Sequence, residues 1–356
     1  PLLKNMTHCL SHRGPDETGY HIEKGLGFGF SRLSIIDLTT GNQPHSNEDQ
    51  TIFSVCNGEI YNYRELRQDL AAKGHSFRTN CDVEVLVHLY EEQGADFIKN
   101  LNGQFAFAIY DKPKRVLILA RDHVGIAPLF YTVADHQLIF GSEIKSILAH
   151  PAVKREVNLT GLDQIITFPG LISPTTMFKD IHSVEPGHFI YYKDGKITNH
   201  EYWDIVYPEE SAIKIPRNED EYIDKIDEIL TQAVRYRLNA DVPVGFYLSG
   251  GLDSSLIAAL IHNISPNEKR HSFSITFPQN DINERQYQQI MAKHVGSIHH
   301  EAEFDHDQIS TRLRNVIYHT ECPLKESYDT CSLALSRLVR EHALKVILTG
   351  EGADEL

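Results

Sequence analysis

The sequence predicts two domains: an N-terminal α+β layered sandwich, and a C-terminal α/β domain built on a doubly wound parallel sheet. Short β-like runs separated by turn residues fill positions 25–202, with helices between them. From residue 218 onward, strands instead alternate with helices. Prolines and charged residues cluster within 202–217, which marks a linker. The predicted domains are therefore residues 1–205 and 218–356.

The N-terminal elements mix strands with amphipathic helices. An opening helix is expected over 2–10, and two more over 63–73 and 82–94, each with apolar residues on one face. The β-like runs are 50–54, 106–110, 116–120, 138–141 and 188–192. This mixture favours sheet packed on sheet inside and helices outside.

The C-terminal elements alternate regularly. Helices are expected over 219–239, 254–262, 283–295 and 330–343, and strands over 242–248, 271–277, 299–304 and 345–349. Such alternation is typical of a parallel sheet, whose ligands bind at the carboxyl ends of its strands. Two glycine-containing turns, after Leu248 and after Thr349, follow strands in this way.

Composition narrows the class of protein. The chain has 356 residues, 41% of them hydrophobic and 23% charged, which is ordinary for a globular protein. A net charge of −15 argues against a nucleic-acid partner or an anionic membrane surface. The sequence contains no apolar run of membrane length and no secretory signal. Its five cysteines form no CxxC pair, so a reducing, cytoplasmic location is expected.

A β-rich run leads directly into the sequence Ser249-Gly250-Gly251-Leu252-Asp253-Ser254-Ser255, which opens a helix. Backbone N–H groups and the helix dipole at such a turn suit a phosphate, and glycines let the backbone approach it. Asp253 can hold Mg²⁺, while Ser254 and Ser255 supply hydroxyl donors. A lone Ser-Gly-Gly is usually only a turn, but the full motif resembles the pyrophosphate loop of ATP pyrophosphatases. That resemblance implies ATP and Mg²⁺ as cofactors.

A second apolar strand, 345–349, runs into the turn Gly350-Glu351-Gly352-Ala353-Asp354-Glu355. Acidic groups beside a phosphate loop are explained by a metal or a cationic transition state, and the alternative is a solvent-exposed acidic cap. Together the two motifs resemble the synthetase domain of glutamine-hydrolysing asparagine synthetases. The resemblance implies a role for each residue. Pyrophosphate would be bound by Ser249, Gly250, Gly251, Ser254 and Ser255, and magnesium would be held by Asp253 and Asp354. The adenine and ribose would be lined by Leu248 and Ile275, AMP would be contacted by Thr349 and Gly350, and Glu351 would be needed to form and aminate the β-aspartyl-AMP intermediate.

Four N-terminal segments fit the same family. They are Ser-His-Arg-Gly-Pro-Asp at 11–16, Arg-Leu-Ser-Ile-Ile-Asp at 32–37, Asn-Gly-Glu-Ile-Tyr-Asn at 57–62 and Asn-Cys-Asp-Val-Glu-Val at 80–85. In this order they resemble the glutaminase domain of class II amidotransferases, which has the αββα fold of N-terminal-nucleophile (Ntn) hydrolases. Without that context, an isolated Asn-Gly would be a hairpin turn.

The resemblance implies a glutamine pocket. Arg32 would bind the α-carboxylate, and Asp82 and Glu59 the α-ammonium. Asn57 and Gly58 would form the oxyanion hole that stabilises the tetrahedral intermediate. The segment 12–16 is expected to be structural, shaping the loop beside the pocket.

The nucleophile of that family is an N-terminal cysteine whose α-amino group acts as base. This chain begins with Pro1, and Cys9 lies inside the expected helix, where it is a poor candidate. We expect a fragment of a longer chain. Either a Met-Cys-Gly start lies upstream, or the glutaminase is inactive. The lysine that stabilises the adenylate in relatives is expected downstream.

Three functions remain open from the sequence. The first is amidation of L-aspartate to L-asparagine with ammonia from glutamine, releasing AMP, pyrophosphate and glutamate. The second is amidation of another carboxylate, such as a peptide, sugar acid or antibiotic precursor. The third is a non-catalytic glutamine or nucleotide sensor. The oligomeric state, a homodimer included, is left open, and the His299-His300 pair is expected at a strand edge rather than on a metal.

Overall fold

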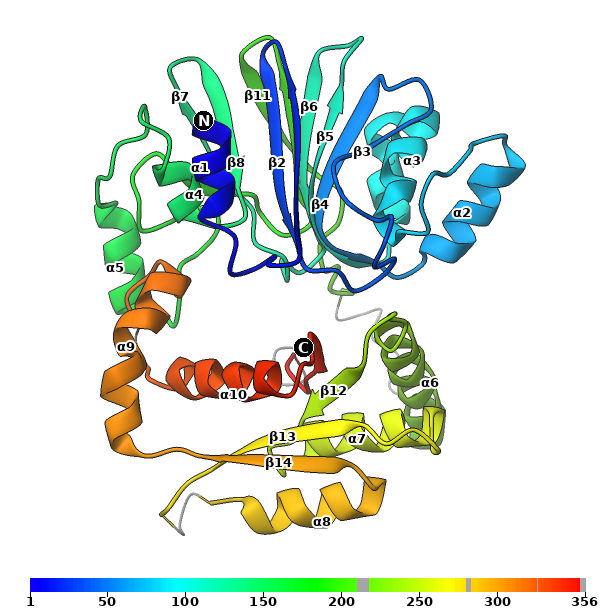
Figure 1. Cartoon of the computed structure of the whole chain (residues 1–356), viewed down its shortest axis with the longest axis vertical. Coiled ribbons are helices and arrows are strands. Elements are labelled where there is room, and N and C mark those ends of the chain that lie inside the picture. Colours follow the sequence, from blue (N-terminus) through cyan, green and yellow to red (C-terminus); the bar gives the residue numbers. More distant parts are fainter. Residues whose placement is uncertain (210–217, 280–282, 325, 353–356) are drawn as a thin grey trace. The chain divides into compact units, whose positions relative to one another are not determined.

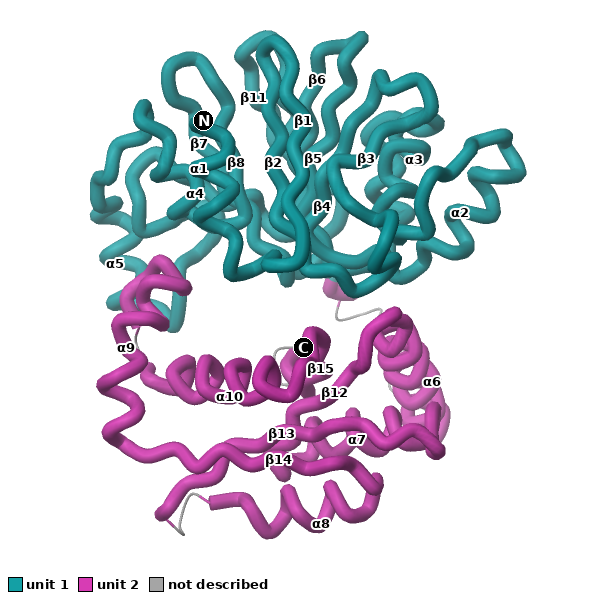
Figure 2. The backbone as a smooth tube through the Cα atoms, viewed as in Figure 1, with its two compact units in different colours: residues 1–206 teal, residues 207–356 magenta. Residues whose placement is uncertain are grey.

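The computed structural model describes residues 1–209, 218–279, 283–324 and 326–352. The chain divides into two compact units, Pro1–Val206 and Tyr207–Leu356, which are coloured separately in Figure 2. Each unit has its own hydrophobic core, and each is described by itself below.

A six-stranded antiparallel sheet forms the centre of the N-terminal unit, with strand order β11-β10-β6-β5-β4-β3 (Figure 1). The strands are β3 (His45–Ser46), β4 (Ile52–Ile60), β5 (Gly103–Asp111), β6 (Val116–Arg121), β10 (His188–Lys193) and β11 (Lys196–Glu201). The central strands are apolar at nearly every position because both faces of the sheet are covered.

A second β-layer packs on one face of this sheet. It consists of the hairpin of β1 (Glu17–Glu23) and β2 (Leu26–Arg32) and a three-stranded sheet of order β8-β7-β9. The latter strands are β7 (Phe130–Ala134), β8 (Gln137–Gly141) and β9 (His182–Ser183). Phe28 of β2, Leu119 of β6 and Leu129 beside β7 fill the core between the two layers.

Helices cover the two outer faces. Helices α2 (Tyr63–Ala72) and α3 (Val85–Gln93), with the 3₁₀ turns Asp82–Glu84 and Gly94–Asn100, pack on the six-stranded sheet. Helices α1 (Leu2–His8) and α4 (Ile144–Leu148) pack on the second layer, and α5 (Leu159–Thr167) follows α4 along the chain. The resulting α-β-β-α layering confirms the predicted sandwich.

The C-terminal unit contains a parallel sheet of order β14-β13-β12-β15. Its strands are β12 (Val244–Tyr247), β13 (His271–Thr276), β14 (Ile298–Glu303) and β15 (Val346–Leu348). The helices are α6 (Glu219–Arg237), α7 (Leu252–Ile264), α8 (Arg285–Val295), α9 (His306–Thr320) and α10 (Asp329–Glu341). Side chains of α6, α7 and α8 pack in one core cluster and those of α10 in another, so the sheet is doubly wound, as predicted.

Two predicted elements differ from the structure. The helix expected over 82–94 is a 3₁₀ turn followed by α3, and the turn places Asp82 at the start of the segment. Helix α9 was not anticipated, because Val316 is its one buried residue and the remainder of its surface is polar or partly exposed. Within the described parts of the chain, no helix combines the length and the apolar character needed to cross a membrane.

The packing of β2 generates a stability prediction. Phe28 is 0% exposed, whereas Ile22 on the paired strand β1 is 67% exposed. Phe28→Ala is expected to lower the free energy of unfolding by about 3–5 kcal/mol, because it removes contacts and leaves a cavity between the sheets. Urea unfolding measures the change. The control variant Ile22→Ala should have a free energy of unfolding close to that of the wild type. An equal loss of stability in both variants would contradict this packing.

Candidate active sites

A cavity of about 1100 Å³ opens in the N-terminal unit, between the two β-layers. All five residues that the sequence predicts for glutamine binding line it: Arg32, Asn57, Gly58, Glu59 and Asp82. They come from three segments that are distant along the chain. The fold therefore gathers them into one concave site, which is the setting that a small polar ligand requires.

Strand β4 presents two of these side chains to the cavity by its alternation. Phe53 and Val55 face the core between the sheets, so Asn57 and Glu59 lie on the same face of the strand. Gly58 has a φ of +140°, and a Cβ added there would lie 2.0 Å from the carbonyl oxygen of Gln104. This position therefore requires glycine for both its conformation and its close contact with β5.

Arg32 ends β2, and its side chain is almost fully buried. Its Nη1 donates to Oε2 of Glu17 at 3.0 Å, and its Nη2 donates to the carbonyl oxygens of Ile36 and Asp37 at 2.9 and 2.6 Å. A Cβ on Gly41 would lie 2.4 Å from Nη2. A buried cation needs such partners, and together they hold the guanidinium in one position at the cavity wall.

Asp37 closes the loop that contacts Arg32. Its carboxylate accepts hydrogen bonds from the Thr40 N–H at 2.9 Å, from the Thr40 hydroxyl and from the Asn80 N–H at 2.8 Å. Burial opposes ionisation, but these hydrogen bonds outweigh it and lower the pKa of Asp37 to about 2. Sequence reasoning assigned Asp37 no role, although an Asp that begins Asp-Leu-Thr-Thr is typical of a side-chain-closed turn.

Asp82 lies in the 3₁₀ turn before α3 and is 4% exposed. Its Oδ2 accepts a hydrogen bond from the Ile60 N–H at 2.8 Å, which ties the turn to the end of β4. Burial disfavours the charged carboxylate and raises the pKa of Asp82 to about 6, even though this hydrogen bond acts in the opposite direction. Asp82 is therefore a cavity carboxyl group whose pKa of about 6 lies well above the ordinary aspartate value.

The segment 12–16 holds the end of β2, and its residues His12 and Arg13 also line the cavity. Asp16 accepts a hydrogen bond from the Ser34 N–H at 2.7 Å, and its own N–H donates to the Arg32 carbonyl at 3.0 Å. Nε2 of His12 and Nη1 of Arg13 lie 3.0 and 3.3 Å from Oε1 of Glu143. The Asp16 contacts position the end of β2, which fits the structural role expected from the sequence, whereas His12 and Arg13 tie the segment to the start of α4.

In the C-terminal unit, the turn after β12 closes around two hydroxyl groups. The Ser249 N–H donates to Oγ of Ser254 at 3.2 Å, the two serine Oγ atoms lie 2.9 Å apart, and the Gly251 N–H donates to Oγ of Ser249 at 3.2 Å. Helix α7 begins directly afterwards, with Asp253 in its first turn. The first N–H groups of a helix have no partner within the helix, so the start of this thirteen-residue helix is suited to an anion.

Gln288 of α8 braces this turn and was missed from the sequence. It is 3% exposed, and its amide donates to the carbonyl oxygens of Ser249 at 3.2 Å and Ile275 at 3.0 Å. Gly250 has a φ of +92°, and a Cβ added there would lie 3.1 Å from the Cβ of Tyr287 and 3.2 Å from the Gln288 nitrogen, so α8 packs directly on the turn. A glutamine inside an amphipathic helix pattern gave no signal of this role.

The second predicted turn meets the first one. Thr349, Gly350 and Glu351 follow β15, which pairs with β12 in parallel. A Cβ on Gly350 would lie 2.9 Å from the Ser254 nitrogen and 3.1 Å from the Asp253 Cβ. The strand order reverses between β12 and β15, which is where doubly wound sheets bind their ligands. Glu351 is exposed, and Asp354 lies outside the described residues.

Comparison with known proteins finds a family model for each of the two units. A family model described as a glutamine amidotransferase domain matches residues 1–203, and one described as asparagine synthase matches residues 225–356. Asparagine synthetase [glutamine-hydrolyzing] 1 of Bacillus subtilis is 36% identical over 100% of this chain and 55% of its own length. Amidase chyE of Penicillium rubens is 34% identical over 99% of this chain and 54% of its own length.

Among solved structures, the glutamine phosphoribosylpyrophosphate amidotransferase from B. subtilis matches with a TM-score of 0.41 and 16% identity. That match covers 85% of this chain and 78% of the other. The chain spans about half the length of the curated relatives that it matches.

The geometry of β4 generates a prediction for Gly58. Gly58→Ala is expected to lower the free energy of unfolding by about 1–3 kcal/mol more than Gly74→Ala, because the new methyl group would collide with the β5 backbone. Gly74 is the matched control, since its φ of +102° is also positive but a Cβ there would have no atom within 4 Å. Denaturant unfolding compares the two, and equal losses would show that the conformation alone, and not the contact, requires glycine.

Proposed function

The chain belongs to the glutamine-hydrolysing asparagine synthetase family, and on that premise we propose that the whole protein converts L-aspartate to L-asparagine. Glutamine hydrolysis in the N-terminal unit supplies ammonia and releases glutamate. In the C-terminal unit ATP activates the aspartate side chain as β-aspartyl-AMP, which ammonia then attacks. The products are asparagine, AMP and pyrophosphate.

The observation that carries this proposal is the contact between the two turns of the C-terminal unit. Gly350 lies against Asp253 and Ser254, so the pyrophosphate-loop motif and the acidic turn share one site. At Gly251 an added Cβ would have only the Ser249 hydroxyl within 4 Å, so the backbone of this turn can approach a triphosphate closely. Asp253 is the described carboxylate that would hold Mg²⁺, and the ion would offset the charge of the phosphates.

Adenylation makes chemical sense at such a site. A carboxylate oxygen is a poor leaving group. When it attacks the α-phosphate of ATP, pyrophosphate departs and the oxygen becomes part of AMP, which ammonia can then displace. The N–H groups at the start of α7 would bind that pyrophosphate, together with the hydroxyls of Ser249, Ser254 and Ser255. Leu248 and Ile275 would line the nucleoside and Thr349 would contact AMP, while Glu351 would accept a proton from the incoming ammonia.

The cavity of the N-terminal unit is proposed to bind glutamine. Arg32 would pair with the α-carboxylate, and Asp82 with Glu59 would bind the α-ammonium. The side-chain amide of Asn57 and the backbone N–H of Gly58 would donate to the oxyanion of the tetrahedral intermediate. Cys56 and Cys81 also line the cavity, but burial raises the pKa of both thiols, so neither suits a nucleophile.

A second candidate keeps the chemistry and changes the acceptor. The Penicillium amidase is nearly as similar to this chain as the Bacillus synthetase is, at 34% against 36% identity. Another carboxylate could then take the place of aspartate.

For the cellular location we infer the cytoplasm, because all five cysteines are free thiols.

The proposal predicts that the whole protein forms AMP and asparagine in equal amounts when ATP, Mg²⁺, glutamine and L-aspartate are supplied. Omitting aspartate should abolish AMP formation. Chromatographic quantification of AMP, asparagine and glutamate measures this. AMP formation that needs a different carboxylate would support the second candidate, and glutamine binding without glutamate release would indicate a sensor.

A matched variant separates the two sites. Arg32→Lys keeps the charge but loses the fork of donors, so glutamine-dependent synthesis should fall by about tenfold or more through a raised KM for glutamine. Synthesis from ammonium chloride should remain as in the wild type. If both fall together, Arg32 supports the fold rather than glutamine.

Asp82 generates a pH prediction. The α-ammonium group of glutamine needs the ionised carboxylate, and a pKa of about 6 leaves about nine-tenths ionised at pH 7 but about one-tenth at pH 5. The dissociation constant for glutamine should therefore rise about tenfold between these pH values. Calorimetric titration across pH 5–7.5 measures it. Asp82→Asn should bind weakly at every pH, and a wild-type affinity that does not change with pH would contradict the assignment.

A further inference from the structure

We propose that Glu48, His75, His88 and Glu91 form a binding site for Zn²⁺ on the helical face of the N-terminal unit, apart from the cavity. Each of the four side chains offers one ligand atom, and these atoms all lie within 4.8 Å of one another. The set contains two imidazoles and two carboxylates, which is a mixture that zinc accepts in four-coordinate sites.

Three separate segments bring the four residues together. Glu48 lies in the turn between β3 and β4, and His75 lies in the loop after α2. His88 and Glu91 both belong to α3, three residues apart, so they share a face of the helix. A bound ion would therefore connect the central sheet to both helices that cover it.

The distances between ligand atoms suit a small tetrahedral ion. Nδ1 of His88 lies 3.3 Å from Oε2 of Glu48. Nδ1 of His75 lies 3.5 Å from the other oxygen of that carboxylate, Oε1, and 3.9 Å from Oε2 of Glu91. Bonds of about 2.0–2.2 Å in a tetrahedron place neighbouring ligands about 3.3–3.6 Å apart. Small side-chain rotations would complete the set.

An independent observation is that the buried imidazole of His88 lacks well-formed hydrogen bonds. The His88 side chain is 1% exposed, yet its ring nitrogens lie 3.3 Å from Glu48 and 4.0 Å from Glu84, and neither has a hydrogen bond of good geometry within the described residues. A buried polar atom without a partner is costly, and native proteins rarely leave one. A metal ion on Nδ1 would satisfy it, and the half-exposed carboxylates of Glu48 and Glu91 would leave a path for entry.

Neighbouring groups are placed to orient the proposed zinc ligands. Nε2 of His75 lies 3.3 Å from Oε1 of Glu92, and Nε2 of His88 lies 4.0 Å from Oε1 of Glu84. Histidines that bind metals commonly direct their second nitrogen at a carboxylate, which orients the ring. Two ligand carboxylates also balance the charge of a divalent ion. The Ser76 N–H donates to Oε1 of Glu48 at 2.7 Å and holds that carboxylate in place.

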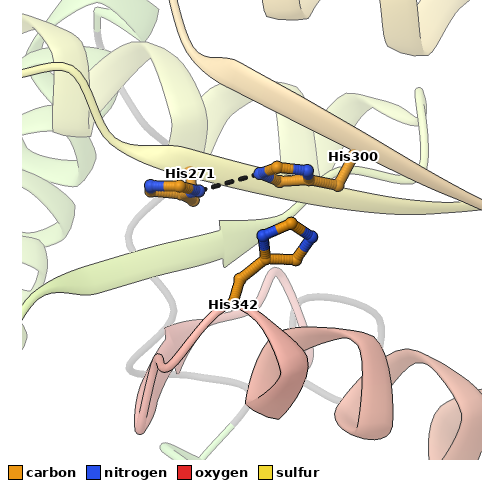
Figure 3. Close-up of side chains that lie close together, drawn as sticks. All are labelled: His271, His300 and His342. Carbon is orange, nitrogen blue, oxygen red and sulfur yellow. Dashed lines mark hydrogen bonds between the residues drawn. The ribbon is translucent and has the colours of Figure 1, made fainter.

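A second histidine cluster supplies a control. His271, His300 and His342 of the C-terminal unit also converge within 4.8 Å (Figure 3). There, however, Nδ1 of His271 and Nε2 of His300 lie 2.8 Å apart and share a hydrogen bond, and those two rings are parallel to within 7°. Those nitrogens are already paired with each other, so this cluster is explained without an ion.

The test uses the protein as purified, with Zn²⁺ added and excess removed by dialysis. Elemental analysis should find zinc bound in stoichiometric amount, and His75→Gln and Glu91→Gln should each lose it. His300→Gln should keep it. Free Zn²⁺ at a hundredfold excess over its dissociation constant should raise the unfolding temperature by about 5–10 °C in the wild type and the control, but not in the two site variants.

His75 and Glu91 are less buried than His88, so their substitution should leave the fold intact, and circular dichroism checks this. Absence of bound zinc in the wild type would overturn the proposal. So would loss of zinc in His300→Gln alone, which would assign the ion to the other cluster. Neither readout depends on activity, so the result stands apart from the outcome of the synthetase assay.

Discussion

Burial of the Arg32 guanidinium is the constraint that organises the N-terminal cavity. A cation removed from water must be surrounded by acceptors, and here they come from Glu17 of β1 and from the carbonyl oxygens of Ile36 and Asp37. The loop after β2 must therefore fold back over the arginine. Asp37 fixes that loop through Thr40 and Asn80, and the contact with Asn80 in turn positions the segment that leads to Asp82. One buried charge thus couples the two groups proposed to bind the α-carboxylate and the α-ammonium of glutamine.

The C-terminal unit depends on a different constraint, which is close approach of backbone to backbone. Gly350 lies so near the start of α7 that a side chain there would collide with Asp253 and Ser254. The parallel pairing of β12 with β15 brings the two turns to the same edge of the sheet, and the reversal of strand order leaves space above it. Gln288 then ties the first turn to β13 through the carbonyl oxygens of Ser249 and Ile275. The site is formed by main-chain geometry as much as by charged side chains.

These two units show which structural elements and site residues the local sequence can predict. Helix α2, strand β5 and the alternation of strands and helices after residue 218 were predicted, because each carries a regular apolar period. Helix α9 was not, since most of its surface faces away from the core. The residues proposed to bind glutamine and the nucleotide were identified through motifs whose glycines and carboxylates are adjacent in the chain. Gln288, Glu17 and Gly41 act across the fold and have no local signature.

The sequence by itself determined the class of each domain, the order of its main elements and the residues proposed to contact glutamine and ATP, because hydrophobic periodicity and contiguous motifs are local properties. Only the tertiary structure decided that Arg32 is a buried cation, that Asp82 titrates near pH 6, and that Glu48, His75, His88 and Glu91 meet. Burial and electrostatic coupling depend on distances between segments that are far apart along the chain. No pattern within one segment contains those distances, so these properties arise with folding.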